Sequence, residues 1–149
     1  GEAASAMAYL RQHNLDRLIK SLHQPVLGIC IGQQLMCRHS MEGDVDCLGI
    51  FDADVLRFAP EMSRLKVPHM GWNTFHVTHP GIITSDMENE YVYYVHSYYV
   101  PVNNATIATT EYINQFSASM HKDNFYSTQF HPEKSGGIGE RILKNFLEL

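Results

Sequence analysis

The segment Gly28-Ile29-Cys30-Ile31-Gly32 has the residue types and the spacing of a nucleophile elbow. It lies between an apolar run typical of a buried strand and a stretch typical of a helix, so we expect Cys30 at a tight, strained turn. Glycine on either side lets the neighbouring backbone approach without a Cβ clash, and the helix N-terminus favours the thiolate, which is the attacking species. A buried structural cysteine beside two glycines would explain the pentapeptide equally well.

The segment His131-Pro132-Glu133 contains the base that such a nucleophile needs. Residues two apart in an extended segment project to the same side, so His131 and Glu133 can share one face, and Pro132 limits flexing between them. A carboxylate on one ring nitrogen orients the imidazole and leaves the other nitrogen for a thiol. A surface turn would explain this tripeptide in isolation, but the two segments together favour nucleophilic catalysis.

Other reactive residues form no recognisable site. The glycine-rich segment 135–139 lacks the Lys-Ser/Thr of a phosphate-binding loop and predicts the entry to a helix. The aromatic residues of segment 91–100 are expected in the core, because no basic residue interleaves with them. Four potential zinc ligands show neither C-x2-C nor H-x3-H spacing, so we expect no metal site: Cys30, Cys37, His39 and Cys47.

The composition indicates a single domain with a real core. The chain has 149 residues, 44% of them hydrophobic and 18% charged. Eleven Lys and Arg against 16 Asp and Glu give a net charge of -5, which argues against nucleic-acid binding. No apolar run of roughly 18 residues is present, so no membrane span is expected. Three cysteines cannot form a closed disulfide framework, and we expect a cytoplasmic protein.

The hydrophobic pattern predicts helices at both ends of the chain and strands between them. Apolar residues at steps of three and four predict a helical start with a break near residues 13–14. A short, fully buried strand is expected at 26–29, a helix at 33–38 and a final helix from Gly136, with Ile138, Ile142, Phe146 and Leu149 on one side. Strands are expected within 48–79 and at 91–100, 106–112, 116–121 and 125–130. We therefore predict an α/β domain with one mixed sheet covered by helices.

Two motifs together resemble those of the class I (triad) glutamine amidotransferases: GICIGQQ at residues 28–34 and FHPEKS at residues 130–135. Two further segments narrow the resemblance to the glutaminase subunits of imidazole glycerol phosphate synthases, from histidine biosynthesis: KVPHMGWN at 66–73 and YVHSY at 94–98. The resemblance covers nearly the whole chain, and the segment around Trp72 is its most specific part. It implies a flavodoxin-like three-layer fold with a mixed sheet flanked by helices.

The resemblance also implies a reaction and a set of site residues. Cys30 would attack the side-chain amide of glutamine, forming a γ-glutamyl thioester and releasing ammonia. His131 would protonate the leaving amine and then activate water, while Glu133 would hold His131 in the right tautomer. The residues expected to hold glutamine are Gln34, Glu42 (through the α-ammonium), the backbone at Ser97 and Tyr98, and Gly32 near the oxyanion. No cofactor is implied.

The family's partner is a (β/α)8 cyclase that receives ammonia through a channel. Trp72, Tyr93 and Lys134 match positions that face this partner. Tryptophan and tyrosine are favoured interface anchors, although core packing of both rings and a solvated lysine would be ordinary alternatives.

The chain departs from the family pattern at its start and at Gln33, where methionine is more usual. Family members have strands ahead of the first helix, ending in a Pro-Gly-rich oxyanion strand, whereas this sequence begins at Gly1. The resemblance therefore predicts a domain that lacks its first strands. Because one oxyanion-hole donor lowers the activation barrier by about 3 kcal/mol, a chain that lacks this strand should be nearly inactive by itself. It should also self-associate or swap elements to cover the open edge.

Three alternatives stay open. The chain could serve another amidotransferase, for example one for anthranilate or GMP synthesis, although segment 68–73 argues against it. It could be a catalytically dead interaction module. A cysteine peptidase fits the elbow alone.

Overall fold

The computed structural model describes residues 2–149. Gly1, before which the resemblance predicts the family's first strands to be missing, lies outside the described residues. Strands in mixed arrangement are flanked by helices, which confirms the predicted α/β class. The prediction of one sheet is wrong, because the strands form three sheets with five, four and two strands.

The main sheet has the strand order β1-β11-β10-β9-β6. Its first pair, β1 and β11, is parallel, and the pairs β11–β10, β10–β9 and β9–β6 are antiparallel. The bounds are β1 Val26–Ile29, β6 His76–Val77, β9 Thr106–Tyr112, β10 Asn114–Lys122 and β11 Phe125–Thr128.

The two smaller sheets arise because the predicted strand 91–100 is divided at Ser97. Its first part pairs with β5, and its second part pairs with β4, so one extended run contributes to two sheets. The bounds are β2 His39–Ser40, β3 Val45–Asp46, β4 Asp54–Arg57, β5 His69–Thr74, β7 Tyr91–His96 and β8 Tyr98–Tyr99. Three 3-10 turns connect strands and helices: η1 Pro60–Met62, η2 Ser85–Met87 and η3 Pro132–Lys134.

The helices begin close to the predicted positions. The break near residues 13–14 is confirmed, since Asn14 has a φ of 55°, a left-handed conformation that asparagine adopts more readily than most residues. The final helix begins at Gly136 as predicted, but Leu149 lies beyond its end and is exposed. The bounds are α1 Glu2–Gln12, α2 Leu15–Ser21, α3 Ile31–Leu35 and α4 Gly136–Leu147, so α3 begins and ends earlier than predicted.

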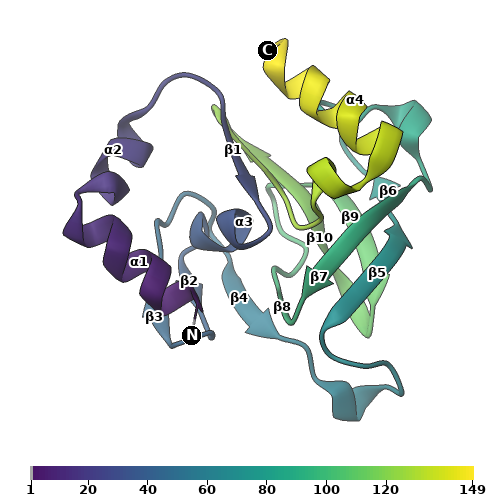
Figure 1. The fold of residues 1–149 in the computed structure, drawn as a ribbon, viewed down its shortest axis with the longest axis horizontal. Helices are drawn as coiled ribbons and strands as arrows, with labels where there is room; N and C mark the ends of the chain where they lie inside the picture. The colour runs from purple at the N-terminus through teal and green to yellow at the C-terminus, as the bar shows by residue number, and fades with distance from the viewer. Residues whose placement is uncertain (1) are drawn as a thin grey trace.

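Two hydrophobic clusters meet at β1. Leu27 packs against the first cluster, which contains Phe116, Phe130 and Ile142. Val26 packs against the second cluster, which contains Met7 and Phe51. The two residues meet different clusters because successive strand residues point to opposite faces. Only Gly28 of this strand is buried, so the expectation of a fully buried strand is wrong; β1 lies at the sheet edge. Figure 1 shows α1 and α2 on one side, α4 on the other, and α3 and β1 between them.

Candidate active site

Cys30 occupies a strained turn between β1 and α3. Its φ is 56° and its ψ is −107°, a combination that non-glycine residues rarely adopt and that costs about 1–3 kcal/mol. Its N–H donates to the Thr128 carbonyl at 2.8 Å, which extends the β1–β11 pairing by one residue and holds the turn in place. The predicted strained elbow is confirmed.

The two glycines of the elbow have different roles. A Cβ on Gly28 would lie 2.7 Å from the Gly32 carbonyl oxygen and 2.8 Å from its carbon, so the close approach predicted for glycine is found there. A Cβ on Gly32 would meet nothing within 4 Å. Gly32 therefore relieves no clash of its own and instead leaves open space beside the turn.

The Cys30 thiol lies between a backbone acceptor and a side-chain donor. Its sulfur donates to the Val95 carbonyl at 3.7 Å and accepts from Gln129 Nε2 at 3.7 Å. Burial raises the pKa of Cys30 above its ordinary value and outweighs the backbone N–H of Ile31, which lowers it. Burial therefore opposes the thiolate that the helix N-terminus was expected to favour.

His131 and Glu133 form the predicted pair. Glu133 Oε2 lies 2.9 Å from His131 Nδ1, so the proton on Nδ1 is donated to the carboxylate and Nε2 is left for another partner. The pairing arises from a 3-10 turn over Pro132–Lys134 and not from the extended segment that the sequence suggested. The His131 N–H donates to the Tyr93 carbonyl at 2.9 Å and fixes the start of this turn.

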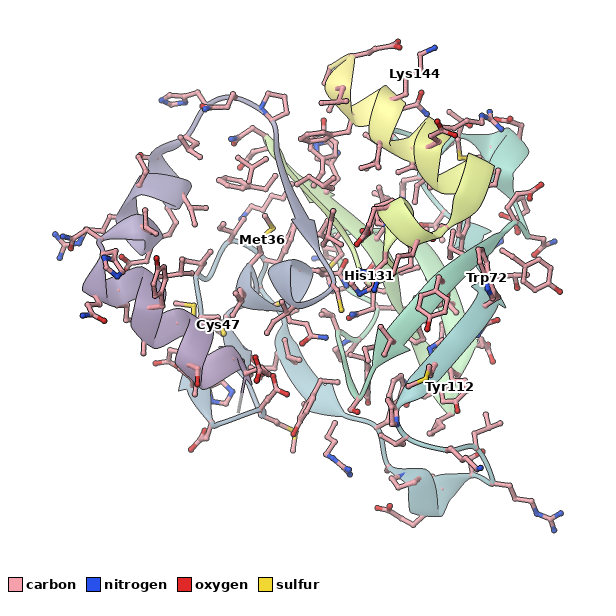
Figure 2. The ribbon with its side chains drawn as sticks, viewed as in Figure 1. Met36, Cys47, Trp72, Tyr112, His131 and Lys144 are labelled. Atoms are coloured by element: carbon pink, nitrogen blue, oxygen red, sulfur yellow. The ribbon has the colours of Figure 1, made fainter. Side chains whose placement is uncertain are left out.

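The parallel pairing of β1 and β11 brings the two motifs to one edge. Ile29 is in register with Thr128, so Cys30 and His131 both follow the carboxyl ends of neighbouring strands. The charge of Glu133 raises the pKa of Cys30 and that of Lys134 lowers it, which places both groups within electrostatic range of the sulfur. Figure 2 shows His131 near the centre of the molecule. The thiol is directed to Val95 in this structure, and apo sites often tighten only when substrate binds.

A cavity of about 200 Å³ opens onto Cys30. It brings together all of the residues expected to hold glutamine except Gly32, which does not line it. Its lining consists of Glu2, Cys30, Ile31, Gln34, Glu42, Val95, His96, Ser97 and Tyr98.

Gln34 and Glu42 are held differently in this cavity. Gln34 Nε2 donates to the Tyr98 carbonyl and to Gln129 Oε1, both at 3.0 Å. Gln34 lines the cavity, and within residues 2–149 both of its side-chain hydrogen bonds are made by Nε2, which leaves Oε1 as an acceptor. Glu42 Oε1 accepts from the N–H of Ala3 at 3.1 Å, so this carboxylate also caps the first turn of α1.

Sequence reasoning missed the buried polar residues around the site. Gln129 is fully buried and contacts the sulfur, and His96 lines the cavity while bonding to a second buried histidine, His69, at 2.9 Å. For His96 the available signal was a polar residue in the otherwise aromatic and β-branched run of β7, whereas Gln129 follows two polar residues, Ser127 and Thr128, and does not stand out. That signal is weak, because its partners lie far away in the sequence.

The residues expected at the partner interface lie on and beside β5 and β7. Trp72 is 54% exposed, which excludes the core alternative, and its ring meets the partly buried Tyr93 ring edge to face at 5.9 Å. Lys134 is exposed in η3, which the Tyr93 carbonyl anchors through His131. Figure 2 shows Trp72 at the rim of the molecule, on the opposite side from α1.

Within residues 2–149, no three His, Cys, Asp or Glu side chains are arranged to hold a metal ion, and all three cysteines are unpaired. No helix in this part of the chain has the length and apolar character to cross a membrane.

The chain was compared with known proteins. A family model described as glutamine amidotransferase class-I matches residues 7–149. The chain is 62% identical over 149 residues to "Imidazole glycerol phosphate synthase subunit HisH" of Bacteroides fragilis (strain YCH46), covering all of this chain and 76% of the relative. A protein of the same name from Escherichia coli (strain K12) is 48% identical over 153 residues, again with 100% and 76% coverage.

Solved structures share the fold at low identity. A putative GMP synthase subunit from Thermoplasma acidophilum matches with a TM-score of 0.63 at 21% identity, over 90% of this chain and 61% of that chain. A glutamine amidotransferase from Thermotoga maritima matches with a TM-score of 0.62 at 16% identity, over 97% and 56%. The sheets and flanking helices described above are thus those of glutamine amidotransferase structures.

Proposed function

The chain belongs to the class I glutamine amidotransferases, and on that premise we propose that it is the glutaminase subunit of an imidazole glycerol phosphate synthase. It hydrolyses glutamine and supplies the ammonia to a cyclase subunit that makes imidazole glycerol phosphate and AICAR in histidine biosynthesis. The curated relatives named above support this assignment, since they match the whole chain and carry that subunit's name. The chain forms a single amidotransferase domain of a cytoplasmic enzyme.

Cys30, His131 and Glu133 perform the hydrolysis. His131 Nε2 takes the thiol proton, because burial raises the pKa of Cys30 and so opposes ionisation of the sulfur. The sulfur then bonds to the side-chain carbonyl carbon of glutamine, and His131 returns the proton to the departing amine, which leaves as ammonia. Water, deprotonated by His131, attacks the thioester and releases glutamate and the Cys30 thiol. Glu133 keeps the Nδ1 proton of His131 in place throughout.

One observation supports this proposal most strongly: the cavity on Cys30 is lined by Gln34, Glu42, Ser97 and Tyr98. Gln34 Oε1 accepts a hydrogen bond from the substrate, Glu42 attracts its α-ammonium, and the backbone at Ser97 and Tyr98 binds its amino-acid end. Gly32 leaves room for the oxyanion to approach the elbow.

Ammonia must reach the cyclase without passing through water, where it is protonated and is no longer a nucleophile. The face formed by Trp72, Tyr93 and Lys134 therefore docks onto the (β/α)8 cyclase, next to the turn that carries His131. The exposed tryptophan ring and the neighbouring lysine support this assignment.

Labelling with the glutamine-like electrophile diazo-oxo-norleucine tests the function. With the cyclase present, we expect one adduct, on Cys30, and glutaminase activity that Cys30→Ala removes. Cys47→Ala is the control, since this second partly buried cysteine lies outside the cavity, and it should change neither result. A chain that forms no Cys30 adduct with the cyclase present is an interaction module. Activation by an anthranilate or GMP synthase partner instead of the cyclase assigns the chain to that enzyme.

A further inference from the structure

Gln129 is a fully buried residue between the two catalytic motifs that the hydrolysis described above does not use. It follows the last residue of β11, and its N–H donates to the Ala118 carbonyl at 2.8 Å. Its side chain lies between Gln34 and Cys30, both of which line the cavity. Oε1 accepts from Gln34 Nε2 at 3.0 Å, and Nε2 donates to Cys30 Sγ at 3.7 Å.

The orientation of the Gln129 carboxamide is determined by a backbone carbonyl. The Tyr98 carbonyl can only accept, so the atom of Gln34 that faces it at 3.0 Å must be the amide nitrogen. The same nitrogen donates to Gln129, which must therefore present its oxygen to Gln34 and its NH2 group to the sulfur. Gln34 thus donates to the Tyr98 carbonyl and to Gln129, and Gln129 donates to Cys30.

A donor at this position distinguishes the two forms of the sulfur. A thiol can donate to the Val95 carbonyl and accept from Gln129, whereas a thiolate can only accept. Deprotonation therefore removes the hydrogen bond to Val95 and strengthens the hydrogen bond from Gln129. The other groups that act on the sulfur are the backbone N–H of Ile31 and the charges of Glu133 and Lys134. The remaining titratable side chains at the cavity are Glu2, Glu42, His96 and Tyr98, with His131 beside it.

We propose that Gln129 is a positioning residue of this site: oriented by Gln34, its carboxamide holds the Cys30 sulfur and favours the thiolate that attacks glutamine. Its part in glutamine hydrolysis rests on the proposed function, whereas its effect on the sulfur does not. Because Gln34 also faces the cavity, the ligand-binding side chain and the nucleophile belong to one hydrogen-bonded unit.

The test measures the rate at which iodoacetamide alkylates Cys30 across the pH range in which a thiol titrates, followed on the Cys30 peptide by mass spectrometry. Gln129→Glu keeps the shape but turns a second carboxylate oxygen toward the sulfur, and Gln129→Leu removes the donor. A hydrogen bond to a charged group is strong enough to move a pKa by about one to two units. We expect both variants to shift the profile upward by that amount, so that Cys30 reacts about ten- to a hundredfold more slowly below its pKa and at the wild-type rate well above it.

Gln33 offers a matched control. It is an equally buried glutamine that bonds to the Ser117 carbonyl and to Ser127 and does not contact the sulfur. Gln33→Glu and Gln33→Leu should leave the alkylation profile in place even where they lower the melting temperature. If Gln129→Leu does not fold, Gln129→Met keeps the length of the side chain without the donor.

Coinciding profiles for wild type and the Gln129 variants would overturn the proposal, as would an equal shift in the Gln33 variants. In complex with the cyclase, the Gln129 variants should lower kcat more than they raise KM. A wild-type complex that does not hydrolyse glutamine would contradict the proposed function alone, because the alkylation profile is measured without glutamine.

Discussion

Cys30 combines backbone strain with an environment that opposes its ionisation. The positive φ turns the residue out of the strand direction, while burial raises the pKa of the thiol. The contacts that lower the pKa come from the next residue in the chain and from Gln129 and Lys134, which lie near His131 in the sequence. Segment 129–134 therefore brings to the sulfur two groups that stabilise its charge, Gln129 and Lys134, and one that opposes it, Glu133.

Gly28→Ala should destabilise the protein, because the new methyl group would press on the Gly32 backbone at 2.7 Å and on Met36 at 3.0 Å. Overpacking of this kind costs about 1–3 kcal/mol, and we expect the free energy of unfolding in urea to fall by that amount. Gly32→Ala is the control, since its Cβ has open space and alanine suits a helix better than glycine. Equal stability of the two variants would show that the elbow does not depend on the Gly28 contact.

At the scale of elements, β5 and β7 are joined by a chain of side-chain hydrogen bonds whose central His69–His96 bond is buried. Asn73 Nδ2 donates to His69 Nε2, His69 Nδ1 to His96 Nε2, and His96 Nδ1 to the Tyr98 carbonyl, at 3.3, 2.9 and 2.8 Å. The final carbonyl can only accept, which determines both histidine tautomers. The chain ends at the same carbonyl that orients Gln34, so this strand pair supports the back of the cavity.

The histidine pair predicts loss of stability in mild acid. Burial lowers the pKa of His69 from 6.5 to about 3 and that of His96 to about 4, so below pH 6.5 the unfolded chain binds more protons than the folded one. Stability contributed by neutral histidines is present above that pH and falls toward pH 4. His69→Gln and His96→Gln should each reduce the slope of unfolding free energy against pH by up to about 1.4 kcal/mol per unit.

Urea unfolding at a series of pH values measures this slope. His79→Gln, at an exposed histidine, should keep the wild-type slope. If neither variant of the buried pair differs from His79→Gln, the two buried rings are already protonated in the folded protein.

At the scale of the whole molecule, the site lies where two hydrophobic clusters meet, and the proposed docking face lies at one rim. Figure 1 places β5 and β7 on the side away from α1 and α2. The catalytic edge between these two sides includes η3, which carries both Glu133 and the exposed Lys134. A partner that binds next to η3 would thus lie close to Glu133 and to His131, which precedes this turn.

Trp72→Ala should weaken cyclase binding, because an exposed tryptophan is a typical interface anchor. We expect Kd, measured by calorimetry, to rise at least about tenfold. Tyr9→Ala removes an aromatic ring of similar exposure, 58%, from α1 on the other side and should leave Kd unchanged. Equal losses in both variants would place the docking face elsewhere.

The open edge of β1 predicts self-association of the isolated chain. Within the described residues, β1 pairs only with β11, and its other edge presents unpaired backbone groups. Light scattering should show a mass that rises with concentration. A clean, stable monomer across concentrations would contradict this expectation.

The elbow and the His131–Glu133 pair could be predicted from sequence because each is local. Glycine spacing and a strand-to-helix transition suffice for the turn at Cys30, and two residues of separation suffice for the carboxylate to reach the imidazole. The division of segment 91–100 at Ser97 could not be predicted, because it depends on which strand each half pairs with. The assignment of catalytic and binding roles within the cavity is still a prediction.

The sequence by itself determined the class of chemistry, the family and the two motifs, since these depend on residue types at short spacing. The tertiary structure alone decided that burial raises the pKa of the thiol and that Gln129 contacts it. Gln129 meets Gln34 across 95 residues and Cys30 across 99. Burial and hydrogen bonding are properties of groups that the fold brings together, and no local pattern carries them.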